Sequence, residues 1–248
     1  MQAIYGVHPV AEALRNDGKI EKIVLLKEGK QGGIREILKI ATQRGIPVVY
    51  RDREYLNLTA GTRQHQGVIC IYEEFRYAGI DTVLTNCKSR ESSLILILDS
   101  ITDPQNLGSL IRTALCFGVN GLVIPEDRAA SVTPAVIKAS AGAALHLPIV
   151  MVVNLSRAID RLKEEGFWIY GADVGCGKNL HHSDYSSHAG LVMGSEGKGI
   201  RPLVKKKCDF LISIPMTDTI DSLNVSVAGG IILYEMTLNR NTSKVKRG

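Results

Sequence analysis

The sequence lacks several features that would assign it to large classes of protein. No run of apolar residues approaches the roughly 18 that a membrane-spanning helix needs, and the N-terminus has no basic region followed by an apolar core, so it does not resemble a secretory signal. The five cysteines are scattered and form no Cys-X-X-Cys pair, which argues against a disulfide framework or a structural zinc site. We therefore expect a cytoplasmic protein without a membrane segment or a metal.

Strong net charge and hydrolase motifs are also missing. The 30 Lys and Arg residues exceed the 25 Asp and Glu residues by 5, which permits a polyanionic partner without requiring one. The histidines have no carboxylate or thiolate partners at metal-ligand spacing, and no serine lies in a Gly-X-Ser-X-Gly elbow. At 248 residues, the chain is long enough for one large domain or two ordinary ones.

The first part of the chain alternates helical and strand patterns. The segments with apolar residues at helical spacing are 7–16, 33–45 and 53–58, and the short apolar runs typical of strands are 19–26, 46–50 and 68–72. We expect residues 1–76 to form a small α/β domain. Residues 77–92 have mixed polarity and weak periodicity, so we expect them to be a linker.

A second α/β series begins at Leu94, and we assign residues 93–248 to it. The run LILILD is continuously apolar, which is typical of a strand buried on both faces of a parallel sheet. The expected strands are 94–99, 121–125, 147–153, 167–172, 190–194 and 210–215, and the expected helices are 107–118, 133–141, 155–165 and 224–238. This alternation predicts an α/β fold with a mainly parallel sheet covered on both faces.

Three loops that follow predicted strands have unusual compositions, and open parallel sheets bind ligands at the carboxyl ends of their strands. The first loop, DPQNLGSLIRTA, offers Asn106 as a candidate N-cap for a helix that starts at Leu107. Arg112 follows six positions later, so we expect both side chains to face one cleft. Taken alone, the loop is better explained by a plain helix cap followed by a surface arginine.

The second loop, GSEGKGI over 194–200, contains three glycines that let backbone N–H groups approach a ligand closely. It has neither the Walker A spacing nor the Gly-X-Gly-X-X-Gly pattern, which disfavours ATP and dinucleotides. From its spacing alone, a flexible glycine-rich turn is the better explanation of this loop.

The third loop, IPMTDTIDSLNVSVAGG over 214–230, places Ser222, Leu223 and Asn224 before a helix whose first turn contains Ser226. Hydroxyl and amide side chains at a helix N-terminus either cap the helix or hold a polar ligand. Capping explains one of these residues but hardly all of them.

Together and in this order, the three loops resemble the signature motifs of the SpoU (TrmH-like) class of SPOUT RNA methyltransferases. The matching residues are Asn106 and Arg112, then 194–197, then 222–226, and the resemblance covers 94–238. The segments IYGVHPVAEAL and RQHQGV resemble the auxiliary domain of the subfamily that modifies large-subunit ribosomal RNA.

The resemblance implies a fold, a cofactor and partners. It implies a catalytic sheet that ends in a trefoil knot, an L30e-like RNA-binding domain before it, and a homodimer that binds RNA and no membrane. It implies S-adenosylmethionine as methyl donor, S-adenosylhomocysteine as product, and no metal. The implied cofactor-binding residues are Met193, Gly194, Gly199, Ile214, Met216, Leu223 and Ser226. The implied catalytic residues are Asn106, Arg112, Glu196, Ser222 and Asn224, and the implied RNA-binding residues are Arg63, His65, Arg112 and Lys198.

The resemblance also implies the reaction, which is methyl transfer to a ribose 2′-hydroxyl of RNA, on a guanosine of bacterial 23S rRNA. In models of this family, the arginine at Arg112 is the base. Because a guanidinium stays protonated in ordinary surroundings, our hypothesis is that Arg112 instead grips the phosphate next to the target. Three alternatives remain: methylation of tRNA or another rRNA site, RNA binding in ribosome assembly without catalysis, and a Rossmann-type nucleotide enzyme.

One segment departs from the pattern. Between Met216 and Ser222 we expect smaller and less acidic residues than the Asp218 and Asp221 found here. Two carboxylates beside an RNA phosphate would repel it unless they pair with Arg112, Lys198 or a cation. The departure bears on the choice of target rather than on the reaction.

Overall fold

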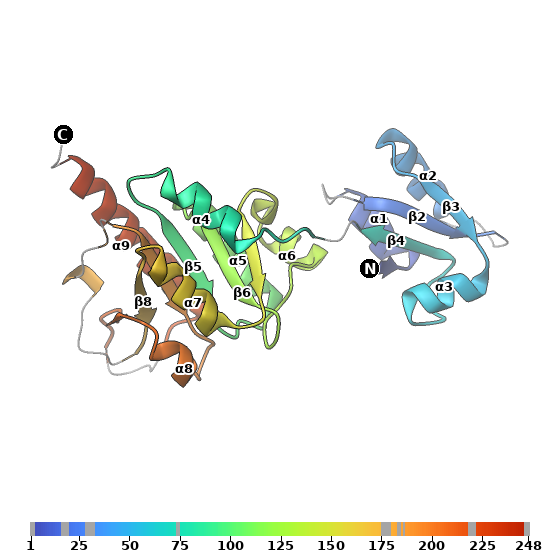
Figure 1. The fold of residues 1–248 in the computed structure, drawn as a ribbon. Coiled ribbons are helices and arrows are strands. Elements are labelled where there is room, and N and C mark those ends of the chain that lie inside the picture. Colours follow the sequence, from blue (N-terminus) through green and yellow to red (C-terminus); the bar gives the residue numbers. More distant parts are fainter. Residues whose placement is uncertain are drawn as a thin grey trace. The chain divides into compact units, whose positions relative to one another are not determined.

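The fold is known from a computed structural model of the chain. The residues that the structure describes are 3–15, 20–27, 33–72, 75–174, 180–182, 185, 187–217 and 222–245. The chain divides into two compact units, Met1–Arg76 and Tyr77–Gly248 (Figure 1). Among the described residues, no helix combines the length and the apolarity that crossing a bilayer requires.

The first unit is a four-stranded sheet with helices on both faces. Its strands are β1 (Ala3–Tyr5), β2 (Ile20–Leu26), β3 (Val48–Arg51) and β4 (Val68–Tyr72), in the order β1-β4-β2-β3. Its helices are α1 (Val7–Arg15), α2 (Ile34–Gln43) and α3 (Arg53–Ala60). The sequence predicted all of these elements except β1, a three-residue strand at the sheet edge.

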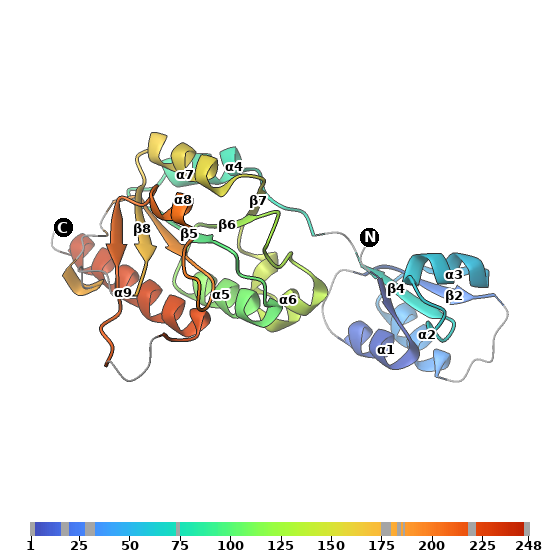
Figure 2. The same cartoon turned by 90° about the horizontal axis from the view of Figure 1, so that it is seen from below.

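Alternation of side chains along the strands gives each face of this sheet its own apolar core. Ile23 and Leu25 of β2 pack with α1 and α2 on one face, whereas Val24 packs with Leu56 of α3 on the other. Successive strand residues point to opposite faces, so one strand serves both layers. Figure 2 shows α3 on one side of the sheet and α1 and α2 on the other.

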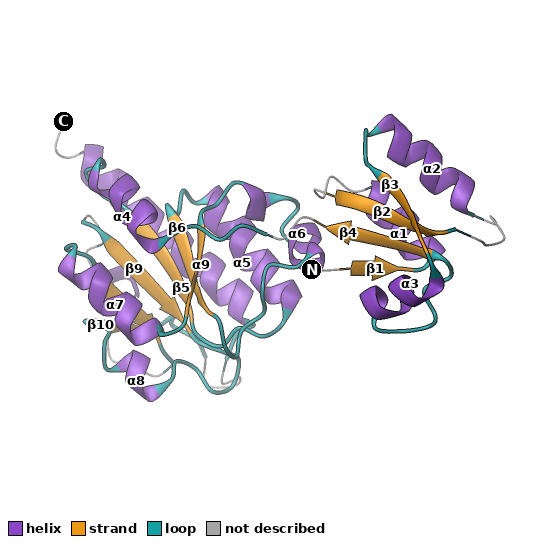
Figure 3. Cartoon of the chain, turned by 45° about the vertical axis from the view of Figure 1, so that its right-hand side comes forward, coloured by secondary structure: helices purple, strands orange, loops and turns teal. Residues whose placement is uncertain are grey.

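The second unit contains a six-stranded sheet in the order β10-β8-β9-β5-β6-β7, in which every pairing is parallel. The strands, drawn side by side in orange in Figure 3, are β5 (Leu94–Leu98), β6 (Gly121–Pro125), β7 (Ile149–Val152), β8 (Trp168–Ala172), β9 (Ala189–Met193) and β10 (Phe210–Ile212). The predicted α/β class with a mainly parallel sheet is confirmed. The trefoil knot stays a prediction.

Helices cover both faces of this sheet. They are α4 (Ile80–Lys88), α5 (Pro104–Cys116), α6 (Pro134–Ala139), α7 (Leu155–Glu164), α8 (Pro202–Lys205) and α9 (Val225–Val245), with short 3-10 turns at Ala143–Leu145 and Leu180–His182. Figure 2 shows α4, α7 and α8 on one face and α5, α6 and α9 on the other. All five residues of β5 are buried between these layers, as a continuously apolar strand requires.

The expected linker 77–92 is mostly a helix of the second unit rather than a connection. Its helix α4 buries Val83, Leu84 and Cys87 in the core that α7 also covers. These positions follow helical spacing, but the polar residues between them make the amphipathic pattern weak over only nine residues. The tertiary environment, not the local periodicity, therefore decided this element.

Strand order explains how distant loops can meet. From β5 the chain continues to β6 on one side, and from β9 it continues to β10 on the opposite side. Loops that leave neighbouring parallel strands in opposite directions open a crevice at the carboxyl ends of those strands. Leu98 pairs with Met193, so the loops after β5 and β9 start beside each other.

Candidate functional site

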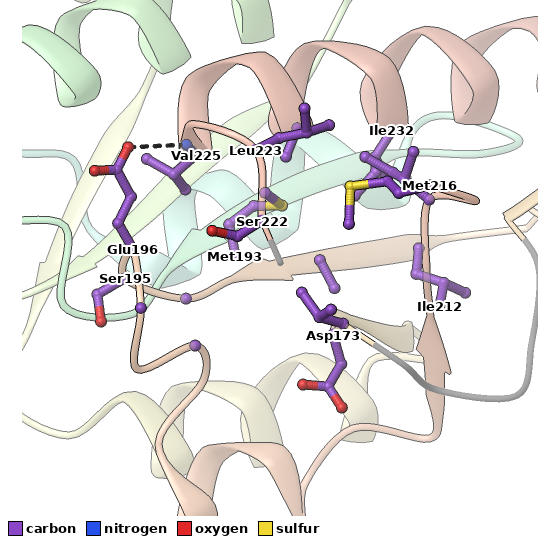
Figure 4. A pocket seen from close by; sticks show the side chains of 17 residues that line it. Asp173, Met193, Ser195, Glu196, Ile212, Met216, Ser222, Leu223, Val225 and Ile232 are labelled. Carbon is purple, nitrogen blue, oxygen red and sulfur yellow. Dashed lines mark hydrogen bonds between the residues drawn. The ribbon is translucent and has the colours of Figure 1, made fainter. Parts of the chain in front are cut away.

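A cavity of about 480 Å³ opens at the carboxyl ends of β8, β9 and β10 and against the start of α9. This volume lies within the range of about 300–1,000 Å³ that small-molecule sites occupy. The lining residues are Ala172, Asp173, Val174, Met193, Gly194, Ser195, Glu196, Gly197, Gly199, Ile212, Ile214, Met216, Ser222, Leu223, Val225, Ala228 and Ile232. In Figure 4, Glu196 lies at one end of the cavity and Ile212 and Met216 at the other.

The glycine-rich loop after β9 forms one wall by folding back on itself. Ser195 N–H donates to the Gly199 carbonyl at 3.2 Å, and Gly199 N–H donates to the Ser195 carbonyl at 2.9 Å. A Cβ atom at Gly194 would lie 2.1 Å from the carbonyl carbon of Gly199, a distance that no side chain can occupy. Gly197 and Gly199 have positive φ angles, which glycine adopts without strain. The glycines of this motif therefore close the wall.

Side chains from all three predicted motifs meet at the cavity edge. Glu196 Oε1 accepts hydrogen bonds from Asn224 Nδ2 at 2.5 Å, from Val225 N–H at 3.1 Å and from Asn106 Nδ2 at 3.5 Å. Asn224 Nδ2 also donates to Asn106 Oδ1 at 3.0 Å. Figure 4 shows the bond between Glu196 and Val225. One carboxylate oxygen thus gathers residues that are 90 and 28 positions away in the sequence.

The start of α9 holds Asn224 in a single orientation. Its Oδ1 accepts from Ser226 N–H at 3.0 Å, Ser226 Oγ at 2.6 Å and Val227 N–H at 3.4 Å. These are the bonds of a helix N-cap, so the opposite end of the amide must point its Nδ2 at Glu196. Ser226 takes part in this cap and does not line the cavity, so the structure gives it a capping position in place of the expected cofactor contact.

A buried ion pair anchors the glycine-rich loop to the end of β5. Asp99 is fully buried, and its two carboxylate oxygens accept from Arg201 Nε at 2.6 Å and from Arg201 N–H at 2.8 Å. The Asp99 N–H donates to the Met193 carbonyl at 2.8 Å. A buried carboxylate with both oxygens satisfied is held rigidly, which fixes where the loop leaves the sheet.

Helix α5 begins earlier than predicted, and this changes the position of Asn106. Asp103, not Asn106, is the N-cap, and its carboxylate accepts from Gln105 N–H and Asn106 N–H. Proline at the first helical position supports this start. Asn106 therefore lies in the first turn, where its side chain is free to reach Glu196.

The structure does not bring Arg112 to the cavity. It is exposed on α5, does not line the cavity, and forms no hydrogen bond or ion pair within the described part of the chain. Six helical residues rotate the chain by about 240° beyond one full turn, so Arg112 points about 120° away from Asn106. The expectation that both face one cleft is wrong within a single chain.

Several of the other expected site residues line the cavity, and their roles stay predictions. Met193, Gly194, Gly199, Ile214, Met216 and Leu223 line the cavity, as does Ser222. Lys198 is exposed in the glycine-rich loop and does not line the cavity. Asp218 and Asp221 lie outside the described residues.

The two expected RNA contacts of the first unit differ in their surroundings. Arg63 is exposed and lines a smaller cavity of its own unit. His65 is only 1% exposed, its Nδ1 accepts from Gly67 N–H at 3.0 Å, and its Nε2 lies 3.1 Å from Asn57 Oδ1. Burial, and then the charge of Arg53, lower the pKa of His65. Its ring therefore supports the loop, and its contact with RNA stays a prediction.

Sequence reasoning missed Asp173, which lines the cavity directly after β8. Its carboxylate accepts from Lys205 Nζ at 2.5 Å and points away from Met193 and Ser222 in Figure 4. Its position at the carboxyl end of a predicted strand was the available signal. Among the described residues, no group of three or more His, Cys, Asp and Glu side chains is placed to hold a metal ion.

Comparisons with known proteins agree with this geometry. The model of the SpoU rRNA Methylase family matches residues 93–234, and a model described as RNA 2′-O ribose methyltransferase substrate binding matches residues 3–78. YacO from Bacillus subtilis, assigned to the TrmH family of tRNA/rRNA methyltransferases, is 39% identical over 96% of each chain. A relative with the same assignment from Staphylococcus aureus is 40% identical, also over 96% of each chain.

Two solved structures show the same fold. The SpoU methyltransferase AviRb from Streptomyces viridochromogenes, solved in complex with AdoMet, has a TM-score of 0.67 and 23% identity, covering 97% of this chain and 90% of that one. The TrmH/SpoU tRNA modifying enzyme of A. aeolicus has a TM-score of 0.56 and 29% identity, covering 66% of this chain and 86% of that one.

Proposed function

Because the chain belongs to the SpoU rRNA methylase family of RNA methyltransferases, we propose that it transfers a methyl group from S-adenosylmethionine to a ribose 2′-hydroxyl of RNA. The observation that carries this proposal is the junction of Asn106, Glu196 and Asn224 at the edge of the cavity. Three motifs that are far apart in the sequence form one polar cluster beside one small-molecule site.

The cavity suits this cofactor in shape and in charge. Its described lining is largely aliphatic, with backbone of the glycine-rich loop along one wall and no Lys or Arg side chain. When bound, the cofactor supplies a methyl group activated by the positive charge on its sulfur. A cationic group is favoured beside the carboxylate of Glu196 and is not opposed by a lining cation.

The polar cluster orients the reacting sugar. Glu196 receives three donors, which hold its carboxylate and the amides of Asn106 and Asn224 in place before any substrate arrives. Catalysis by positioning requires such preorganised groups, because placing a hydroxyl in line with the methyl group removes much of the entropic barrier. We assign Glu196 and the two amides to this task.

Arg112 acts on RNA outside the cavity. Its guanidinium stays protonated, and its exposed position on α5 lets a phosphate reach it from solvent. Arg112→Ala should raise the KM for RNA and lower kcat while cofactor binding stays unchanged. Arg112→Lys should recover only part of the loss, because lysine keeps the charge without the two-pronged grip. Unchanged methyl transfer and RNA binding in Arg112→Ala would remove Arg112 from the site.

We further propose that the chain forms a homodimer through the second unit. Val227, Ile231, Tyr234 and Leu238 are exposed and recur at helical spacing along α9. An exposed apolar stripe of this kind marks an interaction surface. Sedimentation of the intact protein tests the proposal, and Ile231→Glu with Tyr234→Glu should shift a dimer to a monomer.

The proposed target is a guanosine of bacterial 23S rRNA, as in enzymes of the RlmB type. The separate first unit, which matches a substrate-binding model, favours this target over the tRNA that some relatives modify. The test is to map ribose methylation in rRNA and tRNA from cells with and without the protein. Loss of one 2′-O-methylguanosine in 23S rRNA is expected. Loss of a tRNA methylation instead would overturn the target.

The competing function is RNA binding without catalysis. Transfer of tritiated methyl from S-adenosylmethionine to rRNA from the deletion strain decides between the two. Incorporation that disappears with Glu196→Ala supports the enzyme, whereas RNA binding with no incorporation supports the rival.

A further inference from the structure

The first unit has a cavity of its own, about 200 Å³ in volume. It opens where the parallel strands β2 and β3 end, and it is bordered by α2, the start of α3 and the loop before β4. The lining residues are Leu25, Leu26, Lys27, Ile34, Leu38, Tyr50, Arg53, Arg63, His65, Gln66 and Gly67. This volume is below the about 300 Å³ of a typical small-molecule site, but it admits a planar ring of nucleobase size.

The floor and the rim of this cavity differ in chemistry. Leu25, Ile34 and Leu38 form an apolar floor, and Tyr50 stands beside it with 46% of its surface exposed. Lys27, Arg53 and Arg63 line the cavity as well, and none of them has an ion-pair partner among the described residues. No carboxylate belongs to the part of the lining that the structure describes. An apolar, aromatic-sided hollow with unpaired cations suits a ligand that is both planar and anionic.

The loop that carries Arg63 is held in place without a ligand. Gln66 and Gly67 have positive φ angles, and the Gly67 carbonyl accepts from Leu26 N–H at 2.9 Å. Gln66 Oε1 accepts from Val7 N–H at 2.9 Å, and the buried ring of His65 bonds to Gly67 N–H. A preorganised rim loses little conformational entropy when it binds.

The opposite rim is equally defined. Lys27 N–H donates to the Arg51 carbonyl at 2.9 Å, joining the ends of β2 and β3. Asp52 caps α3 by accepting from Tyr55 N–H at 2.8 Å, which places Arg53 at the first helical position. The guanidinium of Arg51 lies 5.7 Å from the ring centre of Tyr55, which extends the basic and aromatic surface beyond the cavity.

We propose that this cavity binds one unpaired nucleotide of the RNA substrate, with its base against Tyr50 and the apolar floor and the adjoining phosphates at Lys27, Arg53 and Arg63. The proposal rests on the proposed function, because it names the part of the RNA that the first unit recognises. A base within a duplex is stacked and paired, so it cannot enter. The cavity therefore selects loops, bulges or ends of RNA.

The aromatic part is tested with Tyr50→Ala against a matched control, Tyr5→Ala. Tyr5 is also exposed but lies on β1, at the opposite edge of the sheet. The probes are a short single-stranded RNA and a blunt RNA duplex. Tyr50→Ala should weaken single-strand binding about tenfold, the effect of one lost base stack, while Tyr5→Ala and duplex binding do not change. Equal effects of the two substitutions, or an equal loss of duplex binding, would overturn the proposal.

Tyr50→Phe and Tyr50→Leu separate stacking from folding. Both keep an apolar side chain, but only Phe keeps the ring, so Phe should bind single strands like the native chain and Leu should not. Binding by both variants at the native level would overturn the base contact.

The cationic part is tested by the salt dependence of single-strand binding. Loss of two phosphate contacts in the double variant Arg53→Ala and Arg63→Ala should reduce the slope of log K against log salt by about 1.4. Arg15→Ala, which removes a cation of α1 that pairs with Glu36 of α2, should leave the slope unchanged. Equal slopes in all three proteins would exclude phosphate contacts at the rim.

Kinetics on rRNA from the deletion strain separate this inference from the proposed function. The cavity variants should raise the KM for RNA while kcat and the KM for S-adenosylmethionine stay constant. If the native chain methylates RNA and the variants have unchanged KM and binding, only the cavity inference fails. If the native chain methylates no RNA, the proposed function fails, and the cavity is judged by the binding data.

Discussion

The two cavities of this chain are built with opposite electrostatics. In the second unit, the described lining contains the carboxylates of Asp173 and Glu196 and no Lys or Arg, and both carboxylates already accept hydrogen bonds from residues beside the cavity. In the first unit, the lining formed by the described residues contains cations and no carboxylate, and those cations have no ion-pair partner in that part of the chain. Each site therefore carries the charge opposite to that of its proposed ligand, which is a cationic cofactor in the second unit and a polyanion in the first.

The two cavities also differ in the interactions that keep their loops rigid. The glycine-rich loop of the second unit is closed by backbone bonds between Ser195 and Gly199 and anchored by a buried ion pair. The loop of the first unit is held by a neutral, buried histidine. Single substitutions can disrupt each of these supports separately, and the expected effects range from loss of cofactor binding to a small change in pH dependence.

Gly194→Ala should have the largest effect. The added Cβ would lie 2.1 Å from the carbonyl carbon of Gly199, so the wall of the cavity must open. We expect loss of measurable S-adenosylmethionine binding in calorimetry, whereas single-stranded RNA binding by the first unit persists. Gly79→Ala is the control, because its Cβ would meet only Thr82 Oγ1 at 3.6 Å. Native cofactor affinity in Gly194→Ala would contradict the assigned wall.

Glu196→Ala should lower kcat/KM for methyl transfer by about 100-fold, the typical cost of removing one preorganised polar group from an active site. The substitution removes one of the two acceptors of Asn224 Nδ2 and the acceptor of Val225 N–H. Glu196→Gln retains an oxygen at this position and should recover part of the rate. A tritium transfer assay measures both. The control Gly79→Ala, outside the cavity lining, should keep the kcat of the native chain.

Asp99→Asn should destabilise the second unit by about 2 kcal/mol. Breaking a buried pair by changing one partner costs roughly 3–5 kcal/mol, but Arg201 is 36% exposed and water solvates it in part. For a unit of this size, the expected shift in Tm is roughly 4–8 °C. Thermal melting checks it. A native Tm together with native cofactor affinity would show that the pair does not anchor the loop.

The smallest expected effect is the pH dependence contributed by His65. Its folded-state pKa lies below the ordinary 6.5 because burial, and then Arg53, disfavour the charged form. The unfolded chain therefore takes up a proton first as pH falls below 6.5. The stabilising contribution is complete above that pH and decreases below it, by at most about 1.4 kcal/mol for each pH unit.

Hydrogen exchange of the first unit at about pH 7.5 and about pH 5.5 measures this slope. Resolution by unit is needed because burial also lowers the pKa of His188 in the second unit. His65→Gln should flatten the slope of the first unit and leave that of the second unchanged. An unchanged slope in the first unit would show that another group titrates there.

Local patterns predicted two kinds of element well: strands that are buried on both faces, and helices with a clear apolar face. LILILD became the fully buried β5, and the helical spacing of 33–45 became α2. The patterns failed where an element is short or where its apolar residues are diluted by polar ones. β1 has three residues, and the apolar positions of α4 are recognisable only against the core that they enter.

The residues of the candidate site were likewise predicted in part. Six of the seven expected cofactor residues line the cavity, because glycine and small polar residues at strand ends have few other local explanations. Asn106 was assigned to the cap because the start of α5 was placed three residues too late. Six helical residues separate Arg112 from Asn106 by about 120° wherever the helix begins, so spacing counted along the sequence did not place both on one face.

From the sequence alone came the alternation of strands and helices, the division near residue 76 and the three polar loops at strand ends, because these follow from periodicity and composition over neighbouring residues. Only the tertiary structure decided that Asn106, Glu196 and Asn224 share one junction, that Asp173 joins the cavity, and that His65 is buried while Arg63 is not. The physical reason is strand order: β9 lies between β5 and β8, and no local pattern encodes which strands become neighbours.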